Sequence, residues 1–522
     1  MTFATDRPTR QVPASDRPAQ RGRRADRVRL PPLAIVTALG FVVVAAALRL
    51  IDISAAYNLF IDEATYSAIA RDTTLATGPI LHGDPFALHP PLALLILSAV
   101  AHVLGTQDIA ALASSLRPFV AVVGSLTVGL LYLTLRRAGL RRAAFLGAAL
   151  VALDPLIISF DSRVMLEAFA QLLAVLTIAA AIRAASAPAS TRWRWTALTA
   201  LAGAATFGSK ETFGLVIFAT LLLIAATAPR GDRRHPLAAA AGTLVGYALV
   251  NVAVINWSGF SVWWQMRTQG LARLLGTHQA TGFKADGTQD SFWNSLLPNS
   301  LQVGATYGIL ALGGVCALSL MWDVLRRRPS VQDLTPTALI AVRVIAIWAV
   351  CACGYVSYAV IFGSLEEQMF YIAATACAVA LAIRVLLIER RTLRRLAMVG
   401  VALLMVAQAA TWTLVHTTSD DVYDQMLARV SDVAPEGSVI SVTEETAQFV
   451  LTGYELGEWV TVPDLEENHV DFVLVSDHLV DHGYGLARPE FADEVRDHGT
   501  LVLVVQGRES DLELYDVRGW TS

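Results

Sequence analysis

Residues 58–91 read NLFIDEATYSAIARDTTLATGPILHGDPFALHPP, and this stretch follows the first long apolar run of the chain. It carries a concentration of ionisable side chains with apolar sequence on both sides, among them Asp62, Glu63, Arg71, Asp72, Asp84 and His89. Carboxylates beside hydrocarbon are costly, and they are usually kept for a function. We therefore predict that this stretch is the catalytic loop of a membrane-embedded enzyme.

The composition of the whole chain is that of a membrane protein. Of its 522 residues, 55% are hydrophobic and only 16% are charged, with a mean hydropathy of +0.52. A soluble protein needs more charge to cover its surface, whereas apolar runs of about 17–25 residues can cross a bilayer as helices. Such runs occur at 31–51, 117–135, 143–160, 164–183, 195–209, 212–228, 236–256, 301–322, 338–362, 369–388 and 396–415. The sequence thus predicts an α-helical polytopic membrane protein with eleven or twelve spanning helices.

Arginine clusters in alternate connections predict the orientation of these helices. The clusters are Arg136/Arg137/Arg141/Arg142, Arg192/Arg194, Arg230/Arg233/Arg234, Arg326–Arg328 and Arg390/Arg391/Arg394/Arg395. Because cytoplasmic loops carry an excess of Lys and Arg, we place all five in the cytoplasm. The loops 52–116 and 257–300 and everything after residue 416 are then external.

The apolar run at 92–104 does not fit this alternation. We expect residues 90–105 to form a helix in the membrane interface, started by Pro90 and Pro91. The alternative is a full crossing, which gives twelve spans and leaves 195–209 as a helix that does not span.

Both ends of the chain differ from its middle. Residues 1–30 are rich in Arg and Pro and lack the apolar core of a signal peptide, so we expect a disordered cytoplasmic tail. Residues 419–522 contain 23 Asp and Glu against five Arg and no Lys. Short apolar, β-branched runs at 438–442, 471–477 and 500–506 and an alternating run at 512–517 predict strands. With helical patterns at 422–433 and 444–452, they predict a small acidic α/β domain outside the cell. The high content of Ala, Arg and Val suggests a bacterial plasma membrane as its location.

The external loop 257–300 is aromatic, with Trp257, Trp263, Trp264 and Trp293. Such side chains favour the headgroup layer. The loop is interpreted either as a pair of interfacial helices or as a wall of a groove for a lipid substrate.

Further charged residues recur where predicted spans reach the external side. They occur in LDPLIISFDSRVMLEAF at 153–169, GSKETFG at 208–214 and GSLEEQMFYI at 363–372. Carboxylates facing Arg and Lys suit a site that deprotonates one group while it holds a phosphate. The candidate residues are Asp161, Arg163, Glu167, Lys210, Glu211, Glu366, Glu367 and Tyr371.

Four of these segments resemble the GT-C superfamily, most closely the bacterial protein O-mannosyltransferase and aminoarabinose transferase branch (glycosyltransferase family 39-like). They are IDEATY at 61–66, HPPL at 89–92, SFDSRVMLEAF at 159–169 and SKETFG at 209–214, and the resemblance covers roughly residues 30–390. It implies a GT-C fold for residues 31–416, a polyprenyl-phosphate-linked sugar donor, an external active site and inversion at the anomeric carbon.

The resemblance also implies roles for individual residues. Asp62 matches the general base for the acceptor, with Glu63 beside it, and Arg163 and Lys210 match ligands of the donor phosphate. The chain departs from the family at Glu167, where eukaryotic O-mannosyltransferases have Asp, and at His89, where aminoarabinose enzymes have Lys. Further residues expected to shape the site or bind the acceptor are His89, Tyr66, Asp161, Glu167, Glu211, Glu366, Glu367 and Tyr371.

Structural explanations compete with these roles. Asp62 and Glu63 also suit the first turn of an interfacial helix, and Arg163 suits a side chain that reaches the headgroups. Lys210 with Glu211 suits an interfacial ion pair, and His89 suits the turn before Pro90.

Together these features predict an inverting glycosyltransferase that moves a sugar from a lipid-linked donor to an extracytoplasmic protein, glycan or lipid. The alternatives are a lipid-linked sugar flippase or transporter, and a binding protein without activity that kept the fold. The expected partners are the polyprenyl-phosphate sugar, membrane lipids and the acceptor. The short basic loops do not suit nucleic acid. No cofactor is certain, and the resemblance leaves a divalent cation open.

Overall fold

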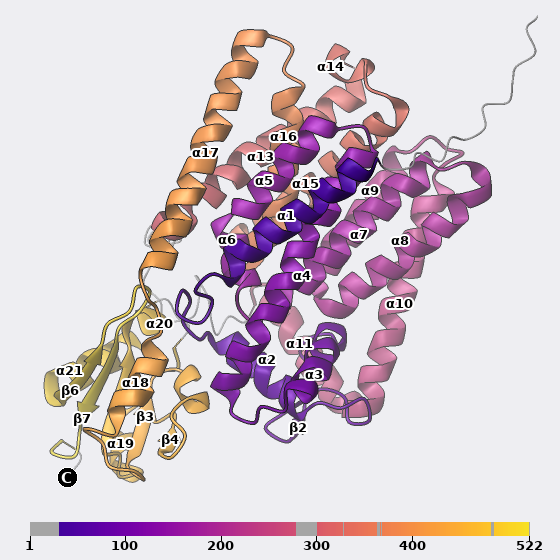
Figure 1. Ribbon diagram of the computed structural model, residues 1–522. Coiled ribbons are helices and arrows are strands. Elements are labelled where there is room, and N and C mark those ends of the chain that lie inside the picture. The colour runs from indigo at the N-terminus through magenta and orange to yellow at the C-terminus, as the bar shows by residue number, and fades with distance from the viewer. Residues whose placement is uncertain are drawn as a thin grey trace, which may run out of the picture.

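A bundle of long helices carries a small sheet domain at one end (Figure 1). The computed structural model describes residues 31–277, 300–326, 328–362, 366, 368–481 and 485–520. The helices of the bundle are α1 (Pro32–Leu50), α4 (Ile109–Arg137), α5 (Arg141–Leu153), α6 (Pro155–Asp161), α7 (Glu167–Ser186), α8 (Ala189–Ser209), α9 (Glu211–Thr227), α10 (Arg234–Ser258), α13 (Ser300–Arg326), α15 (Pro336–Ile361), α16 (Gln368–Leu386) and α17 (Arg391–Thr417).

Each of the eleven predicted apolar runs corresponds to a helix or, for 143–160, to the pair α5 and α6. Within the described ranges, eight helices are long and apolar enough to span a membrane, or nine if the bent pair is one span. The number is lower than predicted because α9 has only 17 residues and α8 begins with the polar sequence ASTRWR. The chain is therefore a helical multi-span membrane protein.

Local sequence explains where several elements begin and end. Asp108 caps α4 by accepting a hydrogen bond from the Ala111 backbone N at 2.8 Å. Asp154 caps α6 in the same way, and Pro155 follows it, so α5 and α6 meet at 62°. Gly105 ends α3 (Pro91–Leu104) with a φ of 69°, a backbone conformation that glycine adopts without strain.

Helix α16 lies at the centre of the bundle. It packs against α5, α13 and α15, and 16 of its 19 residues are buried. By contrast, fewer than a quarter of the residues in the apolar stretches of α1, α10 and α17 are buried, as expected for helices that face lipid.

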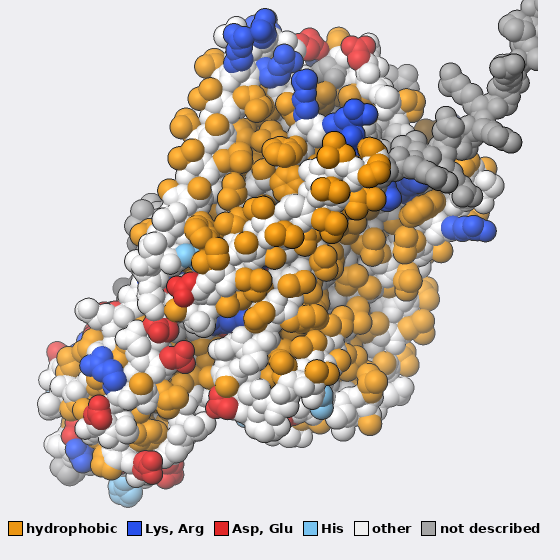
Figure 2. Space-filling model, viewed as in Figure 1, with side chains coloured by type: hydrophobic (Ala, Val, Ile, Leu, Met, Phe, Trp, Pro, Cys, Tyr) orange, Lys and Arg blue, Asp and Glu red, His pale blue; other side chains and the backbone are white. Residues whose placement is uncertain are grey.

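The two ends of the bundle differ in charge. Lys and Arg side chains gather at the end opposite the sheet domain (Figure 2), where α4 and α13 end and α5, α10 and α17 begin. The other end carries the segment between α1 and α4 (Figure 1). This segment forms α2 (Ile61–Asp72), the two-residue strands β1 (Ile80–Leu81) and β2 (Asp84–Pro85), and α3.

Helix α3 has 14 residues and packs on α2, α4 and α8. It begins at Pro91, as the sequence predicted for a helix over 90–105. Helix α11 (Phe260–Leu274) lies near α3 and makes up most of the described part of the aromatic loop (Figure 1). Trp293 and the rest of that loop from 278 to 299 lie outside the described residues.

The C-terminal region is a small α/β unit, as predicted. Its five-stranded sheet has the order β4-β3-β5-β7-β6, with β3, β4 and β5 parallel and β7 antiparallel to both neighbours. The elements are α18 (Val422–Val430), β3 (Val439–Val442), the 3-10 helix η1 (Thr446–Phe449), β4 (Glu455–Gly457), α19 (Val462–Glu467), β5 (Phe472–Ser476), α20 (Asp477–Asp481), α21 (Pro489–His498), β6 (Thr500–Val505) and β7 (Leu512–Asp516). The short helix α14 (Pro329–Gln332) belongs to the bundle. The three-residue strand β4 was missed because its sequence, ELG, carries no alternating pattern.

Arg508, between β6 and β7, holds this unit against the bundle. Its guanidinium donates to the carbonyl oxygens of Val415 at 2.9 Å and Ala56 at 2.8 Å. Val415 lies in the last turn of α17, and Ala56 lies in the loop between α1 and α2. Its side chain also pairs with buried Asp420 at 3.2 Å. The loop between β6 and β7 is thereby fixed relative to the membrane helices.

Candidate active site

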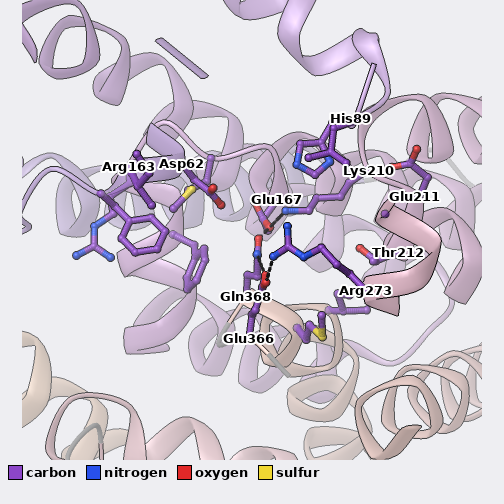
Figure 3. A pocket seen from close by; sticks show the side chains of 18 of the residues that line it. Asp62, His89, Arg163, Glu167, Lys210, Glu211, Thr212, Arg273, Glu366 and Gln368 are labelled. Carbon is purple, nitrogen blue, oxygen red and sulfur yellow. Dashed lines mark hydrogen bonds and ion pairs between the residues drawn. The ribbon is translucent and has the colours of Figure 1, made fainter. Parts of the chain in front are cut away.

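A cavity of about 1150 Å³ lies between the helix bundle and the C-terminal domain. Residues from α2, α6 to α11, α16 and three loops of the sheet domain line it. Figure 3 shows its charged and polar side chains converging from these elements. They include Asp62, His89, Arg163, Glu167, Lys210, Glu211, Arg267, Arg273, Glu366, Gln368, Glu445 and Glu509.

Asp62 lies in the first turn of α2 and faces this cavity (Figure 3). It is half-buried, and within the described residues its carboxylate makes no hydrogen bond or ion pair. Burial raises the pKa of Asp62 to about 6, although the nearby cation of Lys210 lowers it. The side chain is thus a free carboxylate near neutral pH with raised basicity.

Lys210 follows α8 directly and points into the cavity. Its ammonium pairs with buried Glu167 at the start of α7 and donates to Gln368 Oε1 at 2.6 Å. Gln368 in turn donates to Glu366, which pairs with Arg273 of α11 at 2.7 Å. Figure 3 shows these five side chains as one network beside Asp62. Two cations are therefore held in place by two carboxylates and one amide.

His89 and Glu211 lie on the α11 side of the same cavity. Glu211 pairs with Arg267 and accepts from the Tyr247 hydroxyl at 3.2 Å. Arg267 also donates to the Leu88 carbonyl, next to His89, at 3.2 Å. Burial, with three cations nearby, lowers the pKa of His89 well below its usual range. His89 is therefore a neutral side chain at pH 7.

Arg163 faces the C-terminal domain. Its Nη2 lies 3.2 Å from Glu509 Oε2, in the loop between β6 and β7. Its guanidinium also lies over the ring of Tyr57, 5.1 Å from the centroid. In Figure 3, Arg163 and Lys210 lie on opposite sides of Asp62. The two predicted phosphate ligands thus share the cavity but have different neighbours.

Glu63 does not line the cavity, although it adjoins Asp62 in sequence. It is fully buried, and Arg117 of α4 contacts both of its oxygens at 2.8 Å. The Val164 backbone N donates to the same carboxylate at 3.0 Å. Through these hydrogen bonds Glu63 links α2 to α4 and to the loop that carries Arg163.

Asp161 and Tyr371 likewise form a buried network away from the cavity. Asp161 accepts from Arg49 Nε at 2.8 Å and from the Tyr371 hydroxyl at 2.7 Å. Its carboxylate lies so close to α4 that a Cβ at Gly124 would come within 2.2 Å of it. Tyr66 is also buried, with its ring 5.8 Å from that of His89. Glu367 lies outside the described residues.

The sequence alone did not indicate Arg267, Arg273, Gln368 or Glu509 as cavity residues. A signal existed for the two arginines, because external loops seldom carry Arg and residues 257–277 carry Arg267 and Arg273. Glu509 lies more than 340 residues from Arg163 in sequence, and only the docking of the two domains brings them together.

Metal ligands are not grouped in the described part of the chain. No three His, Cys, Asp or Glu side chains there are placed to hold a metal ion. Four carboxylates of the cavity are instead paired with cations: Glu167 with Lys210, Glu211 with Arg267, Glu366 with Arg273 and Glu509 with Arg163.

Comparison with known proteins places this geometry in a wider group. A family model described as dolichyl-phosphate-mannose-protein mannosyltransferase matches residues 88–257, which include His89, Arg163 and Lys210. No curated protein matches the chain significantly.

Two groups of solved structures share the fold. ArnT from Cupriavidus metallidurans in the apo state has a TM-score of 0.57 and 14% identity, over 92% of this chain and 98% of that chain. The same protein bound to undecaprenyl phosphate gives 0.56. The archaeal oligosaccharyltransferase AglB from Archaeoglobus fulgidus, in complex with an inhibitory peptide and a dolichol-phosphate, gives 0.58 and 11%, over 92% and 74% of the two chains. The resemblance predicted from the sequence is thus confirmed: the chain has the GT-C fold of membrane glycosyltransferases, and residues 88–257 match a family within that superfamily.

Proposed function

We propose that this protein is an inverting glycosyltransferase that moves a sugar from a polyprenyl-phosphate donor to an extracytoplasmic hydroxyl acceptor. One observation carries the proposal: a free carboxylate, Asp62, faces a large cavity beside two anchored cations, Lys210 and Arg273. Transfer from a sugar phosphate needs these two components, a base for the acceptor and positive charge for the phosphate.

The donor phosphate is assigned to Lys210 and Arg273. Both cations line the same cavity as Asp62, and one network of ion pairs and hydrogen bonds through Gln368 joins them. Arg and Lys bind phosphate through charge-assisted hydrogen bonds. The similar structures of ArnT and AglB were solved with undecaprenyl phosphate and a dolichol-phosphate, which supports a donor of this class. Arg163, predicted as a second ligand, instead has Glu509 and Tyr57 as neighbours.

The lipid tail of the donor fits the apolar side of the cavity. This side is formed by α9, α10 and α11, with Leu215, Leu244, Trp263 and Leu271. Fewer than a quarter of the residues in the apolar stretch of α10 are buried, so a polyprenyl chain that follows this helix stays in contact with the bilayer.

The reaction then follows from the positions of the charges. Asp62 accepts the proton of the acceptor hydroxyl as its oxygen attacks C1 of the sugar. The bond from C1 to the phosphate oxygen breaks, and its electron pair stays on the phosphate, where Lys210 and Arg273 stabilise the charge. Attack from the side opposite the phosphate inverts the anomeric carbon.

The active site is assigned to the external face. Lys and Arg side chains gather at the end of the bundle opposite the C-terminal domain (Figure 2), where α4 and α13 end and α5, α10 and α17 begin. By the positive-inside rule that end is cytoplasmic. The N-terminus is then inside the cell and the acidic C-terminal domain outside.

Reconstitution in lipid nanodiscs tests the proposal against the transporter alternative. Purified protein is supplied with undecaprenyl-phosphate sugars, and free undecaprenyl phosphate is measured together with sugar on the acceptor. A transferase releases the lipid phosphate, and the Asp62→Asn variant does not. A flippase moves the intact lipid-linked sugar across the bilayer without cleaving it, and that outcome would overturn the proposal. Mass spectrometry of envelope glycans and glycoproteins with and without the chain identifies the product.

A further inference from the structure

The C-terminal domain contributes side chains to the cavity through loops at one end of its strands. Ser476 ends β5, Glu445 follows β3, and Glu509 and Ser510 lie between β6 and β7. Because β3, β5 and β6 run in the same direction, these three positions lie together at the carboxyl ends of the strands. Arg163, which pairs with Glu509, lies on the side of Asp62 opposite Lys210 and Arg273 (Figure 3).

The polar groups at the carboxyl ends of these strands are held in place. Arg508 fixes the loop to the bundle through the carbonyl oxygens of Val415 and Ala56, and its backbone N donates to Asp420 at 3.0 Å. Glu509, the next residue, pairs with Arg163, and the hydroxyls of Ser476 and Ser510 lie 3.2 Å apart. Binding groups that are fixed before a ligand arrives lose little entropy when it binds.

Arg163 has hydrogen-bonding capacity left for a ligand. The residue is only 8% exposed, and its Nε is buried without a hydrogen-bond partner in the described ranges. A buried guanidinium N–H without a partner costs free energy unless a ligand or water accepts from it. Lys210 and Arg273, which are assigned to the donor phosphate, lie on the other side of Asp62. The donor phosphate is therefore not the group that accepts hydrogen bonds from Arg163.

We propose that the C-terminal domain completes an acceptor subsite, and that Glu509, Ser510 and Ser476 together with Arg163 bind the hydroxyls of a neutral saccharide. This inference rests on the proposed transferase function and names the class of its acceptor. The subsite offers a carboxylate acceptor, guanidinium donors and two hydroxyls, which match the mixed donors and acceptors of sugar hydroxyls.

The aromatic surface beside Arg163 also favours a saccharide. Tyr57 and Phe60 present rings beside the guanidinium, at 5.1 and 5.9 Å. The apolar C–H face of a sugar packs on such rings.

An extended peptide fits this face less well. Extended peptides commonly bind by adding a strand to a free sheet edge. The edge strands β4 and β6 supply no residue to the described cavity lining, which is formed by strand ends and loops. The strongly acidic domain, with 23 carboxylates and five arginines over 419–522, also disfavours an anionic acceptor.

Binding measurements on the full chain in lipid nanodiscs test this assignment without relying on transfer. The probes are short oligosaccharides of glucose, galactose, mannose and arabinose, and a Ser/Thr-containing peptide of similar mass, with saturation-transfer NMR as the readout. We expect at least one saccharide to bind. Glu509→Gln and Ser510→Ala should each weaken that binding, roughly tenfold for Glu509→Gln because a charge-assisted hydrogen bond becomes a neutral one. Glu494→Gln, an exposed change of the same kind on α21, should leave it unaltered.

The outcomes separate this inference from the proposed function. Undecaprenyl phosphate, the probe for the donor side, should bind the wild type and the Glu509→Gln and Ser510→Ala variants equally well. If it binds but no saccharide does, or if the peptide binds in a Glu509-dependent way, the acceptor assignment is wrong while the donor site stands. Saccharide affinity that responds to Glu509→Gln and Ser510→Ala no more than to Glu494→Gln also overturns it. Failure of undecaprenyl phosphate to bind the wild type contradicts the proposed function itself.

Discussion

Arg117 of α4 binds Glu63 of α2 through two parallel hydrogen bonds, from Nε and Nη2, each 2.8 Å long. Both side chains are almost completely buried, at 3% and 0% exposure. Asp62, one residue earlier, faces the cavity instead. Successive residues on a helix point about 100° apart, so one acidic dipeptide serves two purposes. Glu63 positions the helix that carries Asp62.

The first prediction concerns this pair. Glu63→Gln removes the charge that balances Arg117, and leaving one partner of a buried ion pair without its counter-charge typically costs about 3–5 kcal/mol. We expect a clear fall in thermal stability of the purified protein, measured by unfolding in detergent. Asp72→Asn, which breaks a solvent-accessible, half-buried pair with Arg71 on the same helix, is the matched control and should change stability little. Equal stability of Glu63→Gln and wild type would contradict the positioning role.

The second prediction concerns the base itself. Asp62→Asn keeps the shape of the side chain and removes its basicity, so transfer should fall by about 10²–10⁴-fold. Because the carboxylate has no ion-pair partner in the described chain, stability and undecaprenyl-phosphate binding should stay unchanged. Transfer near the wild-type rate by the Asn variant would exclude Asp62 as the base.

The third prediction is a pH profile with one acidic limb. Burial raises the pKa of Asp62 to about 6, above the usual range of an aspartate. The ionised form is the base, so single-turnover transfer should fall about tenfold per pH unit below pH 6 and level off above it. His89, with its pKa lowered well below the usual range, stays neutral near pH 6 and adds no second limb. A rate independent of pH between 4.5 and 7 would exclude this titration.

The fourth prediction concerns the donor phosphate. Arg273→Gln removes a charged contact worth about 1.5–3 kcal/mol, so the affinity for undecaprenyl phosphate should fall roughly 10- to 100-fold. Lys210→Met combined with Glu167→Gln should do the same, while Glu167→Gln alone keeps the Lys210 cation and serves as its control. Arg488→Ala, on the exposed surface of the C-terminal domain, controls for a general loss of positive charge. Unchanged binding in both test variants would rule out the assigned phosphate site.

The fifth prediction concerns orientation. The native cysteines lie in α13, α15 and α16, so a chain without them can carry single cysteines at exposed positions. Glu494→Cys on α21 should react with an impermeant maleimide in intact cells. Gly231→Cys, between α9 and α10 at the arginine-rich end, should react only after the membrane is opened. The reverse labelling pattern would invert the topology.

The sequence by itself determined the class of protein and part of the site. Hydropathy identified the helices because hydrocarbon demands long apolar runs. After residue 419, three β-branched runs predicted strands β3, β5 and β6, and an alternating run predicted β7. Short motifs placed Asp62, His89, Glu167 and Lys210 in what proved to be one cavity. These signals are local, so they can be read along the chain.

Only the tertiary structure decided which charges meet. Neighbouring Asp62 and Glu63 diverge because the turn of α2 sends one to the cavity and the other to Arg117. Arg273 joins Glu366, and Glu509 joins Arg163, across about 90 and 350 residues of intervening sequence. A charged residue in a loop has the same local sequence whether it faces water or a partner. The partner is chosen by the packing of α11 and of the C-terminal domain onto the bundle, because burial makes an unpaired charge too costly to keep.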